Sequence, residues 1–224
     1  MAPFPDPTPI FHITPIDNLA SIARAGAILS KRLLERRGVV AANIAYQQIQ
    51  GRRAVKAVPI GAGGNLHDYV PFYFAPRSPM LFTINNGNVP GCDYRQDDIV
   101  HLVSQAQSIR NGGHRFVFSD FHAALDIASF FDDLTCLGEI DWRIFFESPR
   151  LEGYCKYWHN RHETPHHMRR QETRQAEFLV HEDVPIAAIS EIGVRTLQGQ
   201  AQIRAALEGT GWNPTIRVVP SWYF

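Results

Sequence analysis

The sequence predicts one globular domain that combines strands and helices. Its 224 residues are enough for one well-buried core and too few for two generous ones. Hydrophobic residues make up 45% of the chain and include 14 Phe and 4 Trp, which favours a packed interior over a disordered chain. We find neither an internal repeat nor a low-complexity linker, so residues 1–224 are expected to form a single domain.

The first elements are a strand and a helix. Residues 11–14 have a strand pattern, which Pro15 ends. Apolar residues at helical spacing follow, with Thr14 or Asp17 as candidate N-caps and Gly26 as the residue that ends the helix. This order places the end of a strand beside the start of a helix.

A basic stretch comes next. Residues 30–38 are expected to be helical or irregular, and residues 44–53 to form a polar helix. Arg52 and Arg53 end that helix, where cations also suit the helix dipole. Residues 56–65 form a glycine-rich loop, and its spacing fits neither a dinucleotide fingerprint nor a P-loop.

The rest of the chain continues the mixture. An aromatic strand is predicted over residues 69–74, where Pro71 restricts it to a sheet edge or to the start of a strand. Further strands are expected over residues 99–103, 115–118, 186–194 and 215–219. Helices are expected before Gly112, from a cap at Ser119 or Asp120 to Phe131, and over residues 200–207.

Glu177 stands at the start of a further strand. Phe178 and Val180 alternate with other residues in the pattern of a half-buried strand. A carboxylate at the point where burial begins needs a partner or a substrate hydroxyl. The alternative is an ordinary exposed residue at a sheet edge.

The polar stretch before this strand is rich in histidine and arginine. Its histidines are His159, His162, His166 and His167, and Cys155 precedes them. Their spacing matches no standard zinc pattern, so we predict a polar surface loop that turns its arginines toward a phosphate-bearing partner.

Charge is distributed unevenly along the chain. The totals balance, with 22 Lys and Arg against 22 Asp and Glu. Residues 17–56 are nevertheless mostly basic, whereas residues 97–141 carry mainly acidic side chains. A molecule with one basic face binds a polyanion without net positive charge, although solvated helix faces would explain the same pattern.

Cysteines and termini suggest a compartment. Cys92, Cys136 and Cys155 are widely spaced and include no C-x-x-C, which is typical of a reducing environment. The first nine residues carry no basic region like that of a signal peptide, and no apolar run reaches membrane-spanning length. We expect a soluble cytoplasmic protein.

Four stretches together resemble the DarT-type DNA ADP-ribosyltransferases, which are toxins of bacterial toxin–antitoxin pairs. They are residues 11–19 (FHITPIDNL), 68–81 (DYVPFYFAPRSPML), 118–123 (FSDFHA) and 174–180 (RQAEFLV). The resemblance implies an α+β domain with the ADP-ribosyltransferase fold, a split and bent antiparallel sheet around an NAD cleft with flanking helices. It also implies NAD as the substrate that donates ADP-ribose.

The resemblance implies a role for individual residues. Glu177 and Arg53 match the catalytic positions, with Arg52 one residue away from the latter. The matches to NAD-binding positions are His12, Thr14, Asn18, Tyr73, Met80 and His122. The residues expected to contact DNA are Arg52, Lys56, Arg161, Arg169, Arg170 and Arg174. The loop over residues 157–173 matches the segment that selects the DNA substrate.

The chemistry of the reaction agrees with these residue types. Breaking the bond between nicotinamide and ribose spreads positive charge over the ribose, which a carboxylate stabilises. Thymine N3 becomes a nucleophile only when its proton leaves, so a nearby cation helps. No step needs a metal. The acceptor is expected in single-stranded DNA, because N3 is engaged in a duplex.

We therefore expect an NAD-dependent transferase that modifies thymidine, with a macrodomain-containing antitoxin as partner and no association with membranes. Guanosine is the alternative acceptor in DNA, and RNA or protein are alternative acceptors on the same fold. A nucleic-acid-binding domain without catalysis is the alternative of a different class. That domain would not need His12, Tyr73 and Glu177 together.

Overall fold

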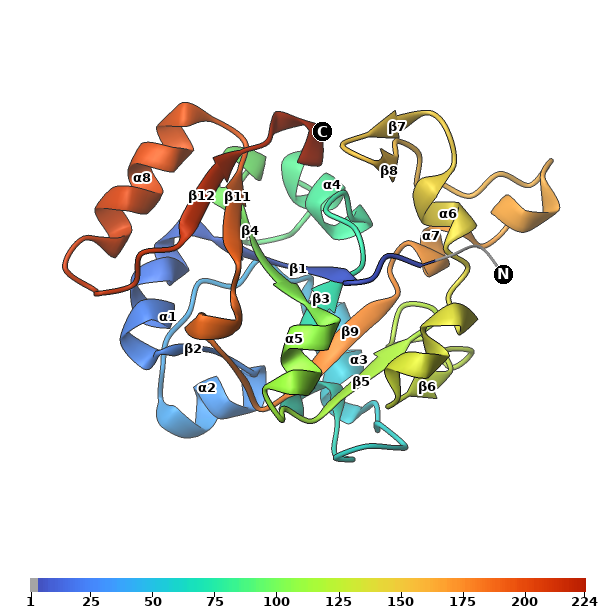
Figure 1. The fold of residues 1–224 in the computed structure, drawn as a ribbon, viewed down its shortest axis with the longest axis horizontal. Coiled ribbons are helices and arrows are strands. Elements are labelled where there is room, and N and C mark those ends of the chain that lie inside the picture. Colours follow the sequence, from blue (N-terminus) through green and yellow to red (C-terminus); the bar gives the residue numbers. More distant parts are fainter. Residues whose placement is uncertain (1–3) are drawn as a thin grey trace.

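The computed structural model describes residues 4–224 and has one large sheet at its centre (Figure 1). The strands are β1 (Pro9–Pro15), β2 (Ala27–Leu29), β3 (Tyr69–Tyr73), β4 (Ile99–Gln105), β5 (Phe116–Ser119), β6 (Phe130–Phe131), β7 (Arg150–Leu151), β8 (Tyr154–Cys155), β9 (Glu177–His181), β10 (Asp183–Pro185), β11 (Glu191–Val194) and β12 (Thr215–Val218). The helices are α1 (Leu19–Ala25), α2 (Lys31–Arg37), α3 (Gln47–Val55), α4 (Pro79–Asn85), α5 (Ala106–Asn111), α6 (Arg143–Phe146), α7 (Arg170–Thr173) and α8 (Leu197–Leu207). Residues 1–3 lie outside this description. They belong to the predicted single domain and to the first nine residues, where no signal peptide is expected.

The large sheet is divided in the middle. Its strand order is β12-β11-β4-β1-β3-β9-β5-β6, and neighbours are antiparallel except β11 and β12, which run parallel and are connected through α8. All seven residues of β1 pair with β4, but β1 meets β3 at one position, where Phe11 lies opposite Tyr73. The structure confirms the predicted α+β fold with a split, mostly antiparallel sheet.

Pro71 lies on the open side of this split. Neither predicted position, a sheet edge or the start of a strand, is correct. β3 lies between β1 and β9 and pairs with β9 along its length, and Pro71 is its third residue. The carbonyl oxygen of Pro71 faces β1, where it accepts a hydrogen bond from His12 Nδ1 (2.8 Å). The nitrogen and carbonyl of a strand residue point to the same side. The missing N–H of Pro71 therefore removes no bond from the pairing with β9.

Apolar side chains cover both faces of β9. Phe178 and Val180 belong to the main core, and Leu179 packs in a smaller cluster with Val117 on the other face. The strand is thus buried on both sides, whereas its sequence pattern predicts a half-buried one. Glu177, at its start, is only 2% exposed, so it is not an exposed residue at a sheet edge.

The helices begin and end largely as their sequences indicate. Gly26 takes the left-handed conformation (φ 70°) directly after α1, and the Ser30 side chain accepts a hydrogen bond from Leu33 N at the start of α2. Neither Thr14 nor Asp17 caps α1, because a turn of 3-10 helix (Ile16–Asn18) leads into it. The helix expected from residue 44 begins later, at the first residue of α3.

The helix expected after β5 does not form. The Asp120 side chain accepts a hydrogen bond from Ser129 N (2.8 Å), so it closes a loop instead of capping a helix. Phe130 and Phe131 then pair with β5 as β6. Side chains such as aspartate and serine compete with the helical backbone in this way, and here the competition removes the helix.

His101, in the middle of β4, makes stability depend on pH. Its buried ring lies 2.9 Å from Pro76 O through Nε2, and burial lowers its pKa to about 4. An unfolded histidine titrates near pH 6.5, so between about pH 6.5 and 4 the unfolded chain binds a proton that the folded chain does not. Stability is therefore lost as the pH falls through this window, by about 3 kcal/mol from this group.

Denaturant unfolding at pH 7 and pH 4.5 measures the effect. We expect His101→Gln to lose less stability on acidification than the original chain, because glutamine has no proton to gain. His162→Gln, on the surface, should lose as much as the original chain. An unchanged pH dependence in His101→Gln would contradict the prediction.

Candidate active site

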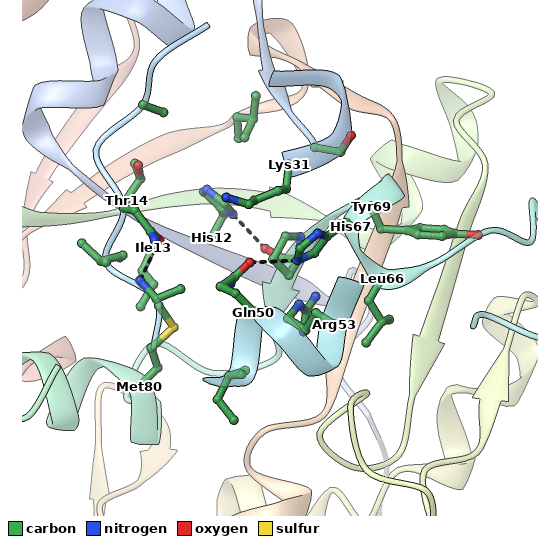
Figure 2. Close-up of a pocket in the computed structure, with 18 of the residues that line it drawn as sticks. His12, Ile13, Thr14, Lys31, Gln50, Arg53, Leu66, His67, Tyr69 and Met80 are labelled. Atoms are coloured by element: carbon green, nitrogen blue, oxygen red, sulfur yellow. Dashed lines mark hydrogen bonds between the residues drawn. The ribbon is translucent and has the colours of Figure 1, made fainter. Parts of the chain in front are cut away.

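A cavity of about 610 Å³ opens at the split in the sheet. Its size falls within the range of small-molecule sites. The predicted site residues that line it are His12, Thr14, Asn18, Arg52, Arg53, Tyr73, Met80, His122 and Glu177. Figure 2 shows how β1, α3 and α4 direct His12, Arg53 and Met80 around this space. The fold therefore brings the predicted catalytic and NAD-binding residues together.

Glu177 and Arg53 form a buried ion pair in the cavity. Arg53 Nη1 lies 2.9 Å from Oε1 and 2.8 Å from Oε2 of Glu177, and both side chains are almost fully buried. The Ala123 N–H also donates to Oε1 (3.2 Å), and the Glu177 N–H donates to Ser119 Oγ (3.2 Å). Arg53 and Ala123, from two separate segments, therefore orient the carboxylate, and Ser119 holds the backbone of the same residue.

This arrangement leaves capacity on both partners. A carboxylate offers about four lone-pair positions, two on each oxygen. Oε1 accepts from Arg53 and Ala123, whereas Oε2 accepts from Arg53 alone. Arg53 Nη2 is buried and has no hydrogen-bond partner among residues 4–224. Glu177 is thus free to accept one more hydrogen bond through Oε2, and Arg53 to donate through Nη2.

His12 is held as a neutral ring with a defined tautomer. Its Nδ1 lies 2.8 Å from Pro71 O, and a carbonyl oxygen only accepts, so Nδ1 carries the proton. Burial lowers the pKa of His12, which keeps the ring neutral at pH 7. Nε2 is left as a hydrogen-bond acceptor for a hydroxyl group.

Tyr73 presents an aromatic ring next to the carboxylate. It lies directly opposite Glu177 in the pairing of β3 with β9, and its hydroxyl donates to Met80 Sδ (3.6 Å). Burial, with a smaller contribution from Glu177, raises the pKa of Tyr73 far above its ordinary value, so the ring stays neutral. Such a ring stacks well on a flat heterocycle.

Asn18 and Thr14 shape the cavity wall. The Asn18 amide donates to Ala42 O (3.0 Å) and accepts from Ala42 N (2.8 Å), and it also donates to Thr14 Oγ1 (3.0 Å). Asn18 therefore binds the backbone of a segment that lines the cavity. Its contribution is to hold that wall in place.

His122 lies beside the ion pair. Its Nδ1 accepts a hydrogen bond from Ala124 N (3.2 Å), which leaves Nε2 to carry the proton. Burial lowers the pKa of His122, partly offset by the charge of Glu177, so the neutral form prevails at pH 7. The ring is a hydrogen-bond donor at the cavity wall.

The residues predicted to contact DNA fall into two groups. Arg52, Arg161 and Arg169 are exposed, and Lys56 forms a surface pair with Asp126 (2.9 Å). Arg52 lines the cavity, whereas Arg53, the next residue on α3, forms the ion pair with Glu177. These four cations remain candidates for contacts with phosphates.

Arg170 and Arg174 do not fit their predicted role as DNA contacts. They are 2% and 1% exposed. Arg174 donates to Cys155 O (3.1 Å) and Arg77 O (3.0 Å), and burial lowers its pKa to about 10. Arg170 pairs with Glu147. Both guanidinium groups connect segments of the interior, which a count of charges along the sequence does not reveal.

Sequence reasoning missed several residues of the cavity. They are Lys31, Gln50, His67, Gln171 and Gln175. Figure 2 shows Gln50 directed toward His67, with His67 Nε2 3.0 Å from Gln50 Oε1. Gln50 stands three residues before Arg53 on α3, so helical spacing from that arginine was the available indication.

The histidine-rich segment forms a polar cluster outside the cavity lining. Glu147, His166 and His167 place a carboxylate oxygen and two imidazole nitrogens within 4.8 Å of one another. Arg170 pairs with the same carboxylate, so the cluster is already neutralised by a cation.

The fold and the site define a class of protein. A split antiparallel sheet, with a buried carboxylate and a tyrosine facing a cavity at the split, is the arrangement expected of an NAD-dependent ADP-ribosyltransferase. A model of the family described as "ssDNA thymidine ADP-ribosyltransferase, DarT" matches residues 11–224. The chain belongs to the DarT family.

Individual relatives agree with this assignment. A DNA ADP-ribosyl transferase from Thermus aquaticus is 40% identical over 225 residues, which cover 99% of this chain and 91% of the relative. DarT from Thermus sp. 2.9, solved in complex with ADP-ribosylated ssDNA, has 38% identity and a TM-score of 0.86, covering 99% and 98% of the two chains. The same Thermus protein in complex with NAD+ matches with a TM-score of 0.82 and 36% identity, covering 99% and 100%.

No helix within residues 4–224 has the length and apolar character needed to cross a bilayer.

Proposed function

We propose that the cavity binds NAD and that Glu177 and Arg53 transfer its ADP-ribose to thymine in single-stranded DNA. The observation that carries this assignment is the buried Glu177–Arg53 pair at the cavity, with an acceptor position left on Glu177 and a donor left on Arg53. The complexes of the Thermus relative with NAD+ and with ADP-ribosylated ssDNA support both substrates.

NAD is placed by the groups around the split. His12 accepts a hydrogen bond from a hydroxyl of the ADP-ribose part through Nε2. Tyr73 packs against the nicotinamide ring, and Met80 Sδ holds the tyrosine by accepting a hydrogen bond from its hydroxyl. Because Tyr73 and Glu177 are opposite each other in the sheet, a nicotinamide on Tyr73 brings its ribose to the carboxylate.

Glu177 stabilises the charge that develops when the nicotinamide leaves. The C1″–N bond breaks, and positive charge spreads over C1″ and the ring oxygen of the ribose. Oε2 accepts a hydrogen bond from the ribose 2″-OH, and the negative carboxylate lies close to the developing charge. Its orientation is fixed in advance by hydrogen bonds from Arg53 and Ala123, so little reorganisation accompanies the reaction.

Arg53 acts on the acceptor base. Thymine N3 gives its proton to water and attacks C1″, which forms the new C–N bond while nicotinamide departs with the electron pair of the broken C1″–N bond. Arg53 Nη2 donates to a carbonyl oxygen beside N3 and stabilises the anion. The same guanidinium holds Glu177 through Nη1, so one residue positions both reactants.

The DNA strand approaches over the exposed cations around the cavity. Arg52, Lys56, Arg161 and Arg169 contact phosphates, and a flipped-out base enters the cleft. Four such contacts predict a moderate dependence of affinity on salt. No step in this mechanism is assigned to a metal ion. As a partner we propose a macrodomain-containing antitoxin that removes the modification.

His12 provides a direct test of NAD placement. We expect His12→Ala to raise KM for NAD by about tenfold or more, since a buried hydrogen bond to the substrate is lost, while kcat changes less. His181→Ala is the matched control, because His181 is on β9 and contacts Arg115 away from the cavity lining. Steady-state kinetics with a thymine-containing oligonucleotide measure both. An unchanged KM for NAD in His12→Ala would contradict the placement.

The acceptor is tested by mass spectrometry. The protein is incubated with NAD and single-stranded oligonucleotides, each lacking one type of base. We expect a gain of one ADP-ribose whenever thymine is present. A gain that follows guanine would move the reaction to the alternative acceptor. NAD consumption without any modified oligonucleotide would point to RNA, protein or water and would overturn the proposed acceptor.

A further inference from the structure

Glu147 binds the histidine-rich segment that precedes the catalytic strand. It directly follows α6. One carboxylate oxygen, Oε2, lies 2.8 Å from His167 Nε2 and 3.5 Å from His166 Nε2, and the other, Oε1, pairs with Arg170. A single side chain therefore holds three residues of one segment.

The pair with Arg170 is the strongest part of this contact. Arg170 is 2% exposed, and its Nε and Nη1 have no hydrogen-bond partner within residues 4–224. Glu147 carries the negative charge that compensates this guanidinium. A buried charge that loses its counterion is costly, so α7, which begins at Arg170, depends on Glu147 for its place.

The segment around α7 also borders the active site. Gln171, on α7, and Gln175, two residues after its end, line the cavity. The carbonyl oxygen of Glu172 accepts a hydrogen bond from His122 N (3.1 Å), and the next N–H along, that of Ala123, donates to Glu177. The helix is thus a wall of the cavity and also a support for the segment that orients the catalytic carboxylate.

Asn160 closes the loop onto the same helix. It accepts a hydrogen bond from Gln171 N (2.7 Å) and donates to the Glu172 side chain (3.1 Å). The exposed cations Arg161 and Arg169 lie on this loop. Anchoring of α7 therefore also fixes where these cations meet a DNA backbone.

We propose that Glu147 is a positioning residue for the acceptor strand: it anchors α7 through Arg170, so that Gln171, Gln175 and the preceding loop hold single-stranded DNA at the cavity. The proposal rests on the function proposed above. It assigns Glu147 no contact with NAD or DNA. Its effect passes through Arg170 and His167 to the wall formed by Gln171 and Gln175.

A metal ion explains the cluster less well. The guanidinium of Arg170 already neutralises Glu147 and would repel a divalent cation. Metal-bound histidines also usually donate their second ring nitrogen to a partner, whereas the buried Nδ1 of His167 has none among residues 4–224. The cluster fits an ion-paired anchor.

Steady-state kinetics of Glu147→Gln test the proposal. Glutamine keeps the size and one acceptor oxygen but removes the charge. We expect KM for a thymine-containing oligonucleotide to rise at least about tenfold, as displaced positioning groups can cost more than that, while KM for NAD stays within about twofold. Asp141→Asn is the control, because the Asp141 carboxylate pairs with Arg143 (2.8 Å) in the same region and makes no hydrogen bond to the loop within residues 4–224.

Further variants separate anchoring from general destabilisation. If Glu147 and Arg170 act as a unit, Glu147→Gln combined with Arg170→Met should raise KM for DNA no further than Glu147→Gln alone. Equal rises in KM for NAD and DNA would show a general loss of structure and would overturn the proposal. A tenfold rise in KM for DNA after chelation of the original protein would overturn it in favour of a metal.

The outcomes also separate this role from the proposed function. If the original chain modifies thymine and Glu147→Gln is equally active on DNA, the role of Glu147 is overturned and the proposed function stands. An original chain that modifies no oligonucleotide would overturn the proposed function and this role with it.

Discussion

Glu177→Gln is expected to lower ADP-ribose transfer to DNA by roughly a thousandfold, the scale at which one preorganised electrostatic group contributes to catalysis. Glutamine is the same size and still offers Arg53 an acceptor oxygen, so the buried guanidinium keeps a partner. The variant loses the negative charge that stabilises the ribose cation. NAD affinity should therefore change by only a few-fold, which isothermal calorimetry measures alongside the rate of transfer.

The control for this variant is a second carboxylate–arginine pair in the same sheet. Glu191 on β11 pairs with Arg217 on β12 (3.3 Å), outside the cavity lining. Glu191→Gln should transfer ADP-ribose at close to the original rate. Undiminished turnover by Glu177→Gln would remove Glu177 from the mechanism.

Arg53→Lys is expected to lower transfer to thymine by about a hundredfold and to change KM for NAD by only a few-fold. Lysine retains a positive charge to pair with Glu177, but its single nitrogen cannot reach the carboxylate and the base together as a guanidinium does. Single-turnover transfer to an oligonucleotide measures the loss. We expect the loss of rate in the step in which the thymine base attacks C1″.

Arg52→Lys is the matched control, since the two arginines are neighbours on α3. Arg52 is exposed and makes only a phosphate contact in the proposed mechanism, which lysine also provides. We expect transfer within about threefold of the original rate, because exposed ionic contacts contribute little. Equal losses in both variants would contradict the distinct role of Arg53.

Much of the site could be predicted because strand ends are marked in the sequence. Tyr73 and Glu177 each stand at an end of a clearly patterned strand, and pairing of β3 with β9 brings them face to face. His12, expected at a strand end, lies in the middle of β1. Arg53 could be placed from the resemblance, but not distinguished by local pattern from Arg52. The distinction comes from burial, since the tertiary fold directs one arginine inward and leaves its neighbour exposed.

Other features depend on contacts between distant segments. The apolar pattern after Ser119 indicated a helix, but hydrogen bonds of Ser119 and Asp120 and the pairing of β6 with β5 were stronger. The local sequence does not distinguish Arg170 and Arg174 from arginines on the surface. The tertiary fold buries them. Glu147 lies outside the histidine-rich stretch, so no local motif connected it to Arg170.

Long-range contacts also explain why the predicted edge position of β3 is wrong. A proline inside a strand normally indicates an unpaired side. Here the unpaired side is internal, because the sheet divides between β1 and β3 and the cavity occupies the gap. Pro71 therefore indicated that one side of its strand is unpaired, but only the sheet topology places that side inside the sheet.

The most direct test of the mechanism compares two single-stranded oligonucleotides that differ only by a methyl group on N3 of one thymine. Each oligonucleotide has a single acceptor base at its centre, which is thymine in the first and N3-methylthymine in the second. Both are incubated with the protein and NAD, and their masses are measured by mass spectrometry. The proposed attack of N3 on C1″ predicts one added ADP-ribose on the first and none on the second. Equal modification of both oligonucleotides would contradict it.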